Sequence, residues 1–492
     1  MVFGGAQVMV TLINVIRGKL VAMVLGATGI GMSSLLTNAA NSIMQATMLG
    51  VNQSGVRDVS QAQKAADHAL LLRVSRIIRT MMFCSALAGM TVAMVCSPLL
   101  ARYTADDVIF WPYFLMLGVA IFFNTLGLGE YTILQGTRQY KSIAYGTVLM
   151  PLCSLLVGVP IYYFWRMDGI VPAMIVQAVL YYAVMRRFTN RHSLGRRPLP
   201  HISLRDTWRQ GKGMITFGMV MMLGSLLGSI TTYAISALIS TMGLLVDVGY
   251  FYAANTITMQ CSALVFTAMA TDYYPKLSGI VNRGRATVFR LVNQQAEIVL
   301  LVIAPIAMLI ILVAPVIIRL LLTDDFLCIR LMMRLMGLAV IFKAACFPFD
   351  YIALAKGDKR FFFVVEGVFS NVRMLVIFPL GYYIYGLDGL GYAALLSGVI
   401  DTIVSISLTR WRYGTRLSRT TVSMFFRLAT MGTACLAFSF IATTWLSYTL
   451  MAAVTIICGT YSYRQLDKRI GIKSLLRQKL AAHRANISGT DN

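Results

Sequence analysis

The sequence predicts an all-α polytopic membrane protein with about 14 transmembrane helices: two parallel six-helix lobes around a central cavity, plus a C-terminal helical hairpin. Three observations predict this fold class. Hydrophobic residues make up 58% of the 492 residues and charged residues only 13%, and the mean hydropathy is +0.72. The hydrophobic residues fall in blocks of about 20 to 26, the length that crosses a ~30 Å hydrocarbon core. Basic loops alternate with loops that are poor in Lys and Arg.

Each predicted span is a hydrophobic run bounded by polar or charged residues. The first run has no basic segment before it and is followed by further spans, so we expect a retained helix and not a cleaved signal. The fourteen predicted spans are residues 2–25, 30–52, 80–101, 109–133, 142–165, 169–186, 214–241, 250–274, 294–318, 329–354, 361–385, 387–409, 423–443 and 446–463.

The basic residues are distributed asymmetrically between the two sets of loops. Of the 43 Lys and Arg residues, 34 lie in or beside every second loop, counting the C-terminal tail. This distribution follows the positive-inside rule and predicts that both termini are cytoplasmic. Because basic loops that face anionic lipid need no nucleic acid, the net charge of +24 does not indicate a nucleic-acid partner.

The loops also predict a two-fold organisation. In each half a basic loop follows the second span and another follows the fourth, with Gly136 and Gly357 at equivalent places in the latter. Six spans per half is an even number, so the halves would be parallel repeats, an arrangement found in transporters. The expected domains are an N-lobe (1–186), a basic cytoplasmic linker (187–212), a C-lobe (213–409), an extra hairpin (410–463) and a basic cytoplasmic tail (464–492).

Motifs of the common enzyme classes are absent from the sequence. It contains no HExxH, GxSxG or GxxxxGK[ST] pattern, and its eight cysteines form no CxxC pair. We therefore expect no enzymatic activity, no catalytic residues, no metal site and no resident cofactor, and we expect the cysteines to pack as small apolar side chains.

Polar side chains form stripes on the first two predicted helices of each half. In the second span, Asn38, Asn41 and Gln45 recur at i, i+3 and i+7, which places them on one helical face. Such stripes also form hydrogen bonds between helices in membrane bundles. Four of them at equivalent places favour a shared water-filled cavity, whose expected lining is Asn14, Asn38, Asn41, Gln45, Ser229 and Asn255.

Charged residues within predicted spans carry more information, because each costs roughly 2.5–3.5 kcal/mol at a helix centre facing lipid. They must therefore face protein, water or a ligand. Structural salt bridges between helices are one interpretation. The other, which we favour because cations are in excess, is a cationic patch that binds an anionic substrate. Its expected members are Arg17, Lys19, Lys343 and Arg373.

The acidic residues within or beside the spans offer two further roles. Asp350 lies seven residues from Lys343 and Glu366 seven residues before Arg373, so each pair shares a helical face. Seven residues span about 10.5 Å along a helix, which is long for a direct ion pair. Asp350, Glu366 and Asp401 are also candidates to couple transport to H⁺ or Na⁺.

Several stretches resemble the Wzx-type O-antigen flippases, which belong to the multidrug/oligosaccharidyl-lipid/polysaccharide (MOP) exporter superfamily. They are GAQVMVTLINVIRGKLVAMVLGATGIGMSSL, MLGVNQSGVRDVSQA, LQGTRQYKSIA, LVFTAMATDYYPKL and LAKGDKRFFF, and the resemblance covers about residues 4 to 410. The extra hairpin departs from the many Wzx proteins with twelve spans and matches the fourteen of lipid II flippases.

The resemblance implies that the protein flips an undecaprenyl-pyrophosphate-linked oligosaccharide, such as an O-antigen repeat unit, from the cytoplasmic to the periplasmic leaflet by alternating access. A glycan polymerase and a chain-length regulator are then expected partners, besides membrane lipids. The alternatives are a lipid II flippase, a drug/cation antiporter of the same superfamily, or a membrane glycosyltransferase or polymerase. The cation excess disfavours the antiporter, and the short extracytoplasmic loops disfavour the enzyme.

Overall fold

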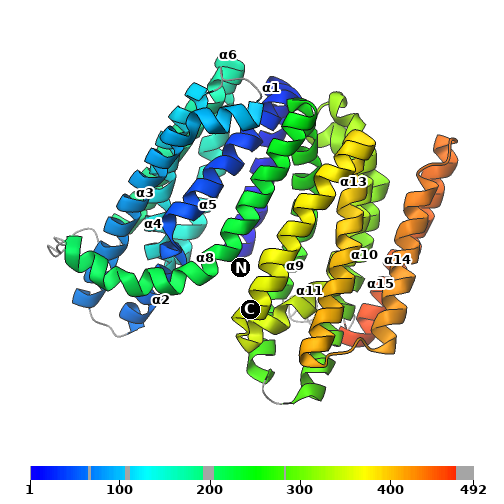
Figure 1. The fold of residues 1–492 in the computed structure, drawn as a ribbon. Helices are drawn as coiled ribbons and strands as arrows, with labels where there is room; N and C mark the ends of the chain where they lie inside the picture. Colours follow the sequence, from blue (N-terminus) through cyan, green and yellow to red (C-terminus); the bar gives the residue numbers. More distant parts are fainter. Residues whose placement is uncertain (1, 65–67, 106–110, 192–203, 282–283, 472–492) are drawn as a thin grey trace, which may run out of the picture. The chain divides into compact units, whose positions relative to one another are not determined.

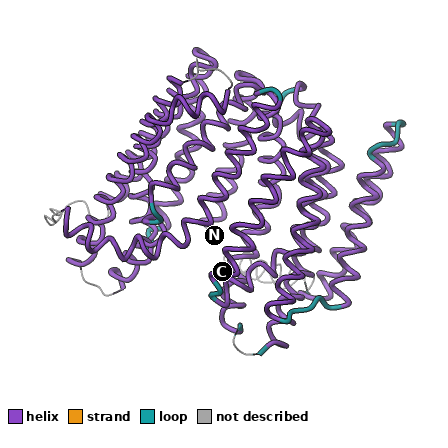
Figure 2. Tube along the Cα trace, viewed as in Figure 1, coloured by secondary structure: helices purple, strands orange, loops and turns teal. Residues whose placement is uncertain are grey.

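The structure is a computed structural model. It describes residues 2–64, 68–105, 111–191, 204–281 and 284–471. Helices account for nearly all of these residues, and the described part of the chain contains no strand (Figure 2). This confirms the predicted all-α fold class.

The helices follow one another with short connections, as Figure 1 shows. In chain order they are α1 (Val2–Met48), α2 (Val51–Lys64), α3 (His68–Ala105), α4 (Trp111–Gly136), α5 (Tyr140–Cys153), η2 (Ser154–Gly158), α6 (Val159–Trp165), η3 (Arg166–Gly169), α7 (Ile170–Arg191), α8 (Leu204–Met242), α9 (Leu245–Ile280), α10 (Arg285–Leu321), η4 (Asp324–Ile329), α11 (Arg330–Lys356), α12 (Lys359–Phe362), η5 (Phe363–Phe369), α13 (Ser370–Tyr413), α14 (Arg419–Phe438) and α15 (Thr444–Ile470).

The helix lengths fit the predicted spans. Eight helical stretches in the described chain are long and apolar enough to cross a membrane. Three of them contain a break, at Gly26, at Arg166 and at Gly386, where the backbone φ angles are 62°, 46° and 58°. Positive φ suits Gly, which has no Cβ, so two of the three breaks use it. Division at these breaks, together with the long helices α9, α11 and α15, is consistent with fourteen spans.

One predicted loop is instead helical. The basic segment between the second and third spans contains α2 and the first turns of α3, which begins at His68 and not at the predicted residue 80. Helix α2 is amphipathic: Val51, Val59 and Ala62 are buried whereas Arg57 and Gln61 are exposed. An apolar stripe at helical spacing forms a helix even where the mean hydropathy is low, and a search for apolar blocks misses it.

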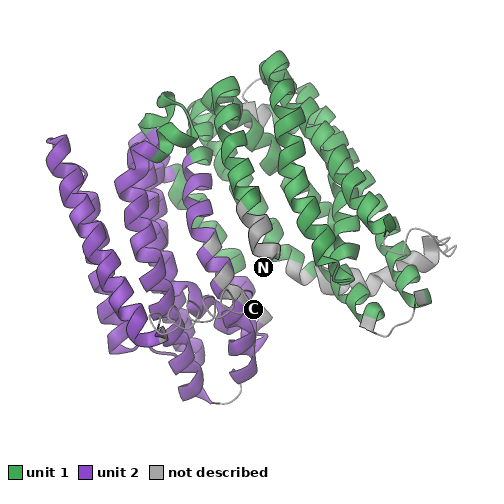
Figure 3. Cartoon of the chain, turned by 180° about the vertical axis from the view of Figure 1, so that it is seen from behind, with its two compact units in different colours: residues 1–253, 317–328, 366–379 green, residues 254–316, 329–365, 380–492 purple. Residues whose placement is uncertain are grey.

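The chain divides into two compact units, coloured separately in Figure 3. Unit 1 comprises residues 1–253, 317–328 and 366–379, and unit 2 comprises residues 254–316, 329–365 and 380–492. In unit 1, α8 packs against α1, α2 and α3, and α4 packs against α3 and α7. The lobe boundaries predicted from the loops remain a prediction.

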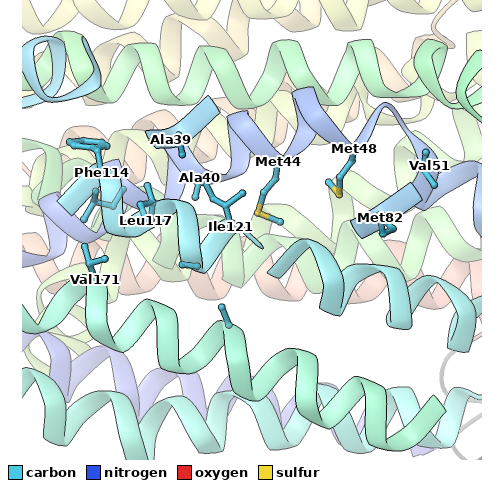
Figure 4. Close-up of a cluster of buried hydrophobic side chains, with 14 of the residues drawn as sticks. Ala39, Ala40, Met44, Met48, Val51, Met82, Phe114, Leu117, Ile121 and Val171 are labelled. Atoms are coloured by element: carbon cyan, nitrogen blue, oxygen red, sulfur yellow. The ribbon is translucent and has the colours of Figure 1, made fainter. Parts of the chain in front are cut away.

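The core of unit 1 forms on one face of α1. Ala40, Met44 and Met48 recur every four residues and are buried against Ile121 of α4 and Met82 of α3 (Figure 4). Residues four apart share a helical face. The polar residues of the same segment therefore lie on other faces of this helix.

The C-terminal hairpin is an integral part of unit 2. Helices α14 and α15 pack together, and α14 packs against α11. Met424 and Leu428 of α14 and Met451 and Cys458 of α15 are buried in a core that includes residues of α10 and α11. None of the eight cysteines, which all lie in the described residues, forms a disulfide, and three of them are buried.

Two hairpins in the two halves of the sequence have the same construction. The fifth and eleventh predicted spans each contain a π-helical turn, η2 in the first and η5 in the second. In each hairpin a glycine lets the two helices approach closely: a Cβ on Gly169 would lie 2.8 Å from Ile161 O, and a Cβ on Gly389 would lie 1.9 Å from Gly381 O. The second pair follows the first by 220 residues, in agreement with a sequence repeat.

Candidate functional site

A polar cavity of about 340 Å³ opens within unit 1 between α1 and α8. Asn38 and Asn41 line it from α1, and Ser225, Ser229 and Thr232 line it from α8. The structure thus brings together the polar stripes of the second and seventh predicted spans. Every lining residue is uncharged, so the cavity offers amide and hydroxyl groups to a ligand.

Hydrogen bonds fix one wall of this cavity. The amide of Asn38 donates to Ser34 Oγ and to Ser236 Oγ, both at 3.4 Å, and so links α1 to α8. Thr232 donates to Gly228 O within its own helix at 2.9 Å. Asn41 is exposed to the cavity. Asn38 is therefore held by a hydrogen bond between α1 and α8, whereas Asn41 faces the cavity.

The segment that carries Arg373 lies against α8. A Cβ on Gly228 would be 4.0 Å from Asn371 Oδ1, and Asn371 itself donates to Gly367 O at 2.6 Å. Gly224 and Gly228 are four residues apart, a small-residue spacing that lets a neighbouring segment approach a membrane helix. Asn371 was not predicted as a site residue. The spacing of Gly224 and Gly228 on α8 is the sequence signal that could have indicated a close neighbour at this place.

Arg373 is 8% exposed, as expected for a charge inside a span. Its Nη2 donates to Ser370 Oγ at 3.2 Å, and the guanidinium carbon is 5.9 Å from the centre of the Phe369 ring. A guanidinium held over an aromatic face retains its charge and keeps a planar set of donors.

The expectation that Glu366 and Arg373 share a helical face assumes a regular α-helix, and it stays a prediction. Residues Phe363–Phe369 are π-helical. A π-turn inserts an extra residue, which rotates all later residues by about 100° relative to a regular helix. The spacing of seven residues therefore does not align these two side chains as it would in an α-helix.

Lys19 lines a second cavity in unit 1, of about 490 Å³. Its lining also includes Arg319, Thr323 and Asp324, with the apolar side chains of Met23 and Leu322. The ammonium of Lys19 donates to Arg319 O at 3.4 Å, and Arg319 Nε lies 3.1 Å from Asp324 Oδ1. Lys19 and the amides of Asn38 and Asn41 thus belong to two different cavities.

Three further predicted residues of unit 1 are half-buried in α1. Arg17 and Asn14 lie in the part of α1 before Gly26, and Gln45 lies after it, one turn beyond Asn41. Their roles in substrate binding remain predictions.

The remaining predicted site residues belong to unit 2, except Glu366, which belongs to unit 1. Lys343 of α11 is exposed, and Asn255 of α9 is half-buried. Asp350 accepts a hydrogen bond from Ser405 of α13, and Asp401 is half-buried on the same helix. The described residues contain no group of three or more His, Cys, Asp or Glu side chains with the geometry to hold a metal ion.

Sequence reasoning did not find the most enclosed ion pair of unit 1. Glu130 of α4 is 2% exposed at its side chain and pairs with Arg79 of α3 and Arg186 of α7. The partners are 51 and 56 residues away, so no local pattern connects them. Arg334 of α11, also not predicted, is 5% exposed and donates to Ile311 O at 3.1 Å.

Residues 46–331 match the model of a family described as "Polysaccharide biosynthesis protein". No curated protein matches the chain in sequence. Among solved structures, the lipid II flippase MurJ in an inward closed conformation has 12% identity and a TM-score of 0.72, over 94% of this chain and 99% of that chain. An inward-facing multidrug resistance MATE family transporter of the MOP superfamily has 17% identity and a TM-score of 0.67, over 82% and 94%. A MATE transporter from Vibrio cholerae has 14% identity and a TM-score of 0.54, over 85% and 100%.

These structural similarities establish the fold, which this chain shares with MurJ and MATE transporters, and the apolar helices make the protein a multi-pass membrane protein. The match to the family model spans more than half of the chain. The chain therefore belongs to the polysaccharide biosynthesis protein family.

Proposed function

We propose that the protein is a flippase that moves an undecaprenyl-pyrophosphate-linked oligosaccharide from the cytoplasmic to the periplasmic leaflet by alternating access. One observation carries the proposal: a cavity lined by amides and hydroxyls, within a membrane-spanning unit whose α8 also lies against the Arg373 segment. Membership of a polysaccharide biosynthesis family supports a glycan as the substrate.

The chemistry of such a substrate matches these groups. A sugar headgroup carries many hydroxyls, and a pyrophosphate carries about two negative charges, neither of which enters hydrocarbon without partners. Asn38, Asn41 and Ser229 offer donors and acceptors for hydroxyls. Arg373 offers a planar fork that suits phosphate oxygens. The polyprenyl tail would remain in the lipid.

A lipid II flippase is the nearest alternative, because its substrate has the same polyprenyl pyrophosphate and MurJ shares the fold. A drug/cation antiporter is disfavoured because every residue that lines the polar cavity is uncharged and because cations are in excess among the charges predicted within the spans. A membrane glycosyltransferase or polymerase would need catalytic carboxylates at a site for two sugars.

The proposal includes a cellular setting. The protein would lie in a bacterial inner membrane with both termini cytoplasmic, as the basic loops indicate. A glycan polymerase and a chain-length regulator would act on its product. Coupling to H⁺ or Na⁺ through Asp350, Glu366 or Asp401 is part of the proposal, because these acids lie within or beside the predicted spans.

Rescue of surface glycan in a strain that lacks its own flippase tests the function. The wild type should restore the glycan, and Arg373→Ala should abolish rescue while the protein still inserts at normal levels. Arg373→Lys should rescue only in part, because a point charge does not reproduce a bidentate fork. Arg360→Ala, which removes an exposed arginine beside the same span, is the matched control and should rescue fully.

The double variant Glu366→Ala with Arg373→Ala separates a substrate site from a structural one. If Arg373 only neutralises a buried acid, removal of both charges should recover expression and rescue. Normal expression without rescue supports the proposal. Failure of the wild type to restore the glycan, with resistance to cationic drugs instead, would overturn it in favour of the antiporter.

A further inference from the structure

The second cavity of unit 1 has features that a structural role for its residues does not require. Lys19 is a cation within a predicted span, and the cavity of about 490 Å³ opens directly beside it. Thr323 lines this cavity, and its Oγ1 is buried and has no hydrogen-bond partner among the described residues. A buried hydroxyl without a partner is costly, and a small rotation of this side chain toward a ligand in the cavity would supply one.

The charges around the cavity indicate what kind of ligand it takes. Lys19 and Arg319 contribute two positive charges, and Asp324 contributes one negative charge. Asp324 bonds to Nε of Arg319, which leaves the Nη edge of the guanidinium available to a ligand within the described structure. An ammonium, a guanidinium edge and a hydroxyl together are donors to the oxygens of an anion, and phosphate oxygens accept all three.

A simpler account is that Lys19 only caps α10. Arg319 lies in the last turn of α10, where backbone carbonyls carry partial negative charge, and the ammonium donates to its carbonyl. At 3.4 Å this bond is long for an ammonium donor, and it uses one of three N–H groups. The cap therefore explains the position of Lys19 but neither the cavity nor the hydroxyl of Thr323.

The geometry points to a phosphate-binding pocket formed by Lys19, Arg319 and Thr323, distinct from the polar cavity of Asn38 and Asn41. Lys19 is seven residues before the break at Gly26, and the predicted topology places that break and the η4 segment on the extracytoplasmic side. This inference rests on the proposed function: the pocket holds the pyrophosphate of the lipid-linked glycan as it leaves. Asp324 competes for Arg319 and so keeps the affinity low enough for release.

Equilibrium binding of radiolabelled inorganic pyrophosphate to the full-length protein in nanodiscs of zwitterionic lipid tests the pocket. Lys19→Ala and Arg319→Ala should each weaken binding about tenfold or more, and Thr323→Val should weaken it less. Asp324→Asn should tighten binding, because it removes a competing anion. Arg330→Ala, an exposed arginine on the same predicted side, is the control and should bind as the wild type does.

The direction in which Asp324→Asn changes pyrophosphate affinity distinguishes a phosphate-binding pocket from a purely structural ion pair. If Asp324 and Arg319 form only a structural pair, Asp324→Asn should behave like Arg319→Ala in melting temperature and leave pyrophosphate binding unchanged, and this result overturns the inference. Unchanged binding in both Lys19→Ala and Arg319→Ala also overturns it.

Two further arms identify the source of the phosphate. Undecaprenyl pyrophosphate in the nanodisc should displace the labelled pyrophosphate, whereas phosphatidylglycerol should not. Displacement by phosphatidylglycerol would assign the pocket to a phospholipid headgroup and overturn its role in exit. A further outcome is that the wild type rescues the glycan while the Lys19→Ala and Arg319→Ala variants bind pyrophosphate and rescue equally well. That result would reject the phosphate pocket but not the proposed flippase function.

Discussion

Arg79 of α3 and Glu130 of α4 form a bidentate ion pair within unit 1, with Nε and Nη2 of Arg79 each 2.9 Å from one carboxylate oxygen. Arg186 of α7 donates to the same carboxylate. Glu130 thus receives donors from α3 and α7, two of the helices that pack against α4. Two cations and one anion leave this cluster with a net positive charge, which the partly exposed Arg186 can share with solvent.

Removal of Glu130 should therefore destabilise unit 1. Glu130→Ala leaves Arg79, which is only 12% exposed, without its counter-ion, and loss of one partner of a buried pair costs about 3–5 kcal/mol. We expect a clearly lower melting temperature in detergent, with a smaller decrease for Glu130→Gln. Asp272→Ala is the control, because Asp272 and Lys276 form an exposed pair on α9, and its melting temperature should match that of the wild type. Equal melting temperatures for the two Ala variants would contradict this reading.

Gly249 should not tolerate a side chain. A Cβ there would lie 1.9 Å from Ala27 O of α1, and a Cβ on Gly31 would lie 2.3 Å from Leu245 O, so the starts of α9 and of the second half of α1 meet backbone to backbone. Gly249→Ala must push these segments apart, at a cost of about 1–3 kcal/mol or more. Thermal unfolding measures the effect. Gly279→Ala in the same helix, where a Cβ would meet nothing within 4 Å, should be neutral or slightly stabilising; a loss as large as that of Gly249→Ala would argue against the close contact.

Asn38 and Asn41 should separate folding from transport. Asn38 links α1 to α8 through Ser236, so Asn38→Ala should lower both the melting temperature and the rescue of surface glycan. Asn41 is exposed to the cavity, so Asn41→Ala should reduce rescue with little change in melting temperature. Thr430→Ala, which changes an exposed residue of α14 that bonds only within its helix, serves as the control. Full rescue by Asn41→Ala would remove Asn41 from the substrate site.

Asp358 should make the turn between α11 and α12 sensitive to acid. Burial acts to raise its pKa, but hydrogen bonds from Phe361 N, Arg412 and Tyr413 outweigh this and hold the pKa of Asp358 below its usual value.

The sign of the effect follows from the depressed pKa. The stabilisation is present above the unfolded value of about 3.9 and is lost as the pH falls through the lower folded value. Asp358→Asn should therefore lower the melting temperature at about pH 7, and the two proteins should converge only as the pH falls below the depressed folded pKa. A constant difference between the two proteins across this range would show that the carboxylate charge does not matter.

Hydropathy and periodicity predicted the features that depend on local sequence. A span is a run of about 20 apolar residues because lipid selects for it, whatever its neighbours are. The faces of α1 and α8 that form the polar cavity were predicted in the same way, since a helix with Asn38 and Asn41 on one face buries its apolar faces elsewhere. These properties belong to single helices, and the sequence by itself determined them.

Only the tertiary structure decided which groups meet. Residues Phe363–Phe369 form a π-helical turn, which changes the helical register before Arg373, and no residue pattern predicts that turn. Lys19 reaches Arg319, 300 residues later, rather than the polar cavity of its own helix. Glu130 binds two arginines from separate helices. Such pairings arise because packing selects one arrangement of many helices at once, whereas a sequence window reports only how each helix partitions between lipid, protein and water.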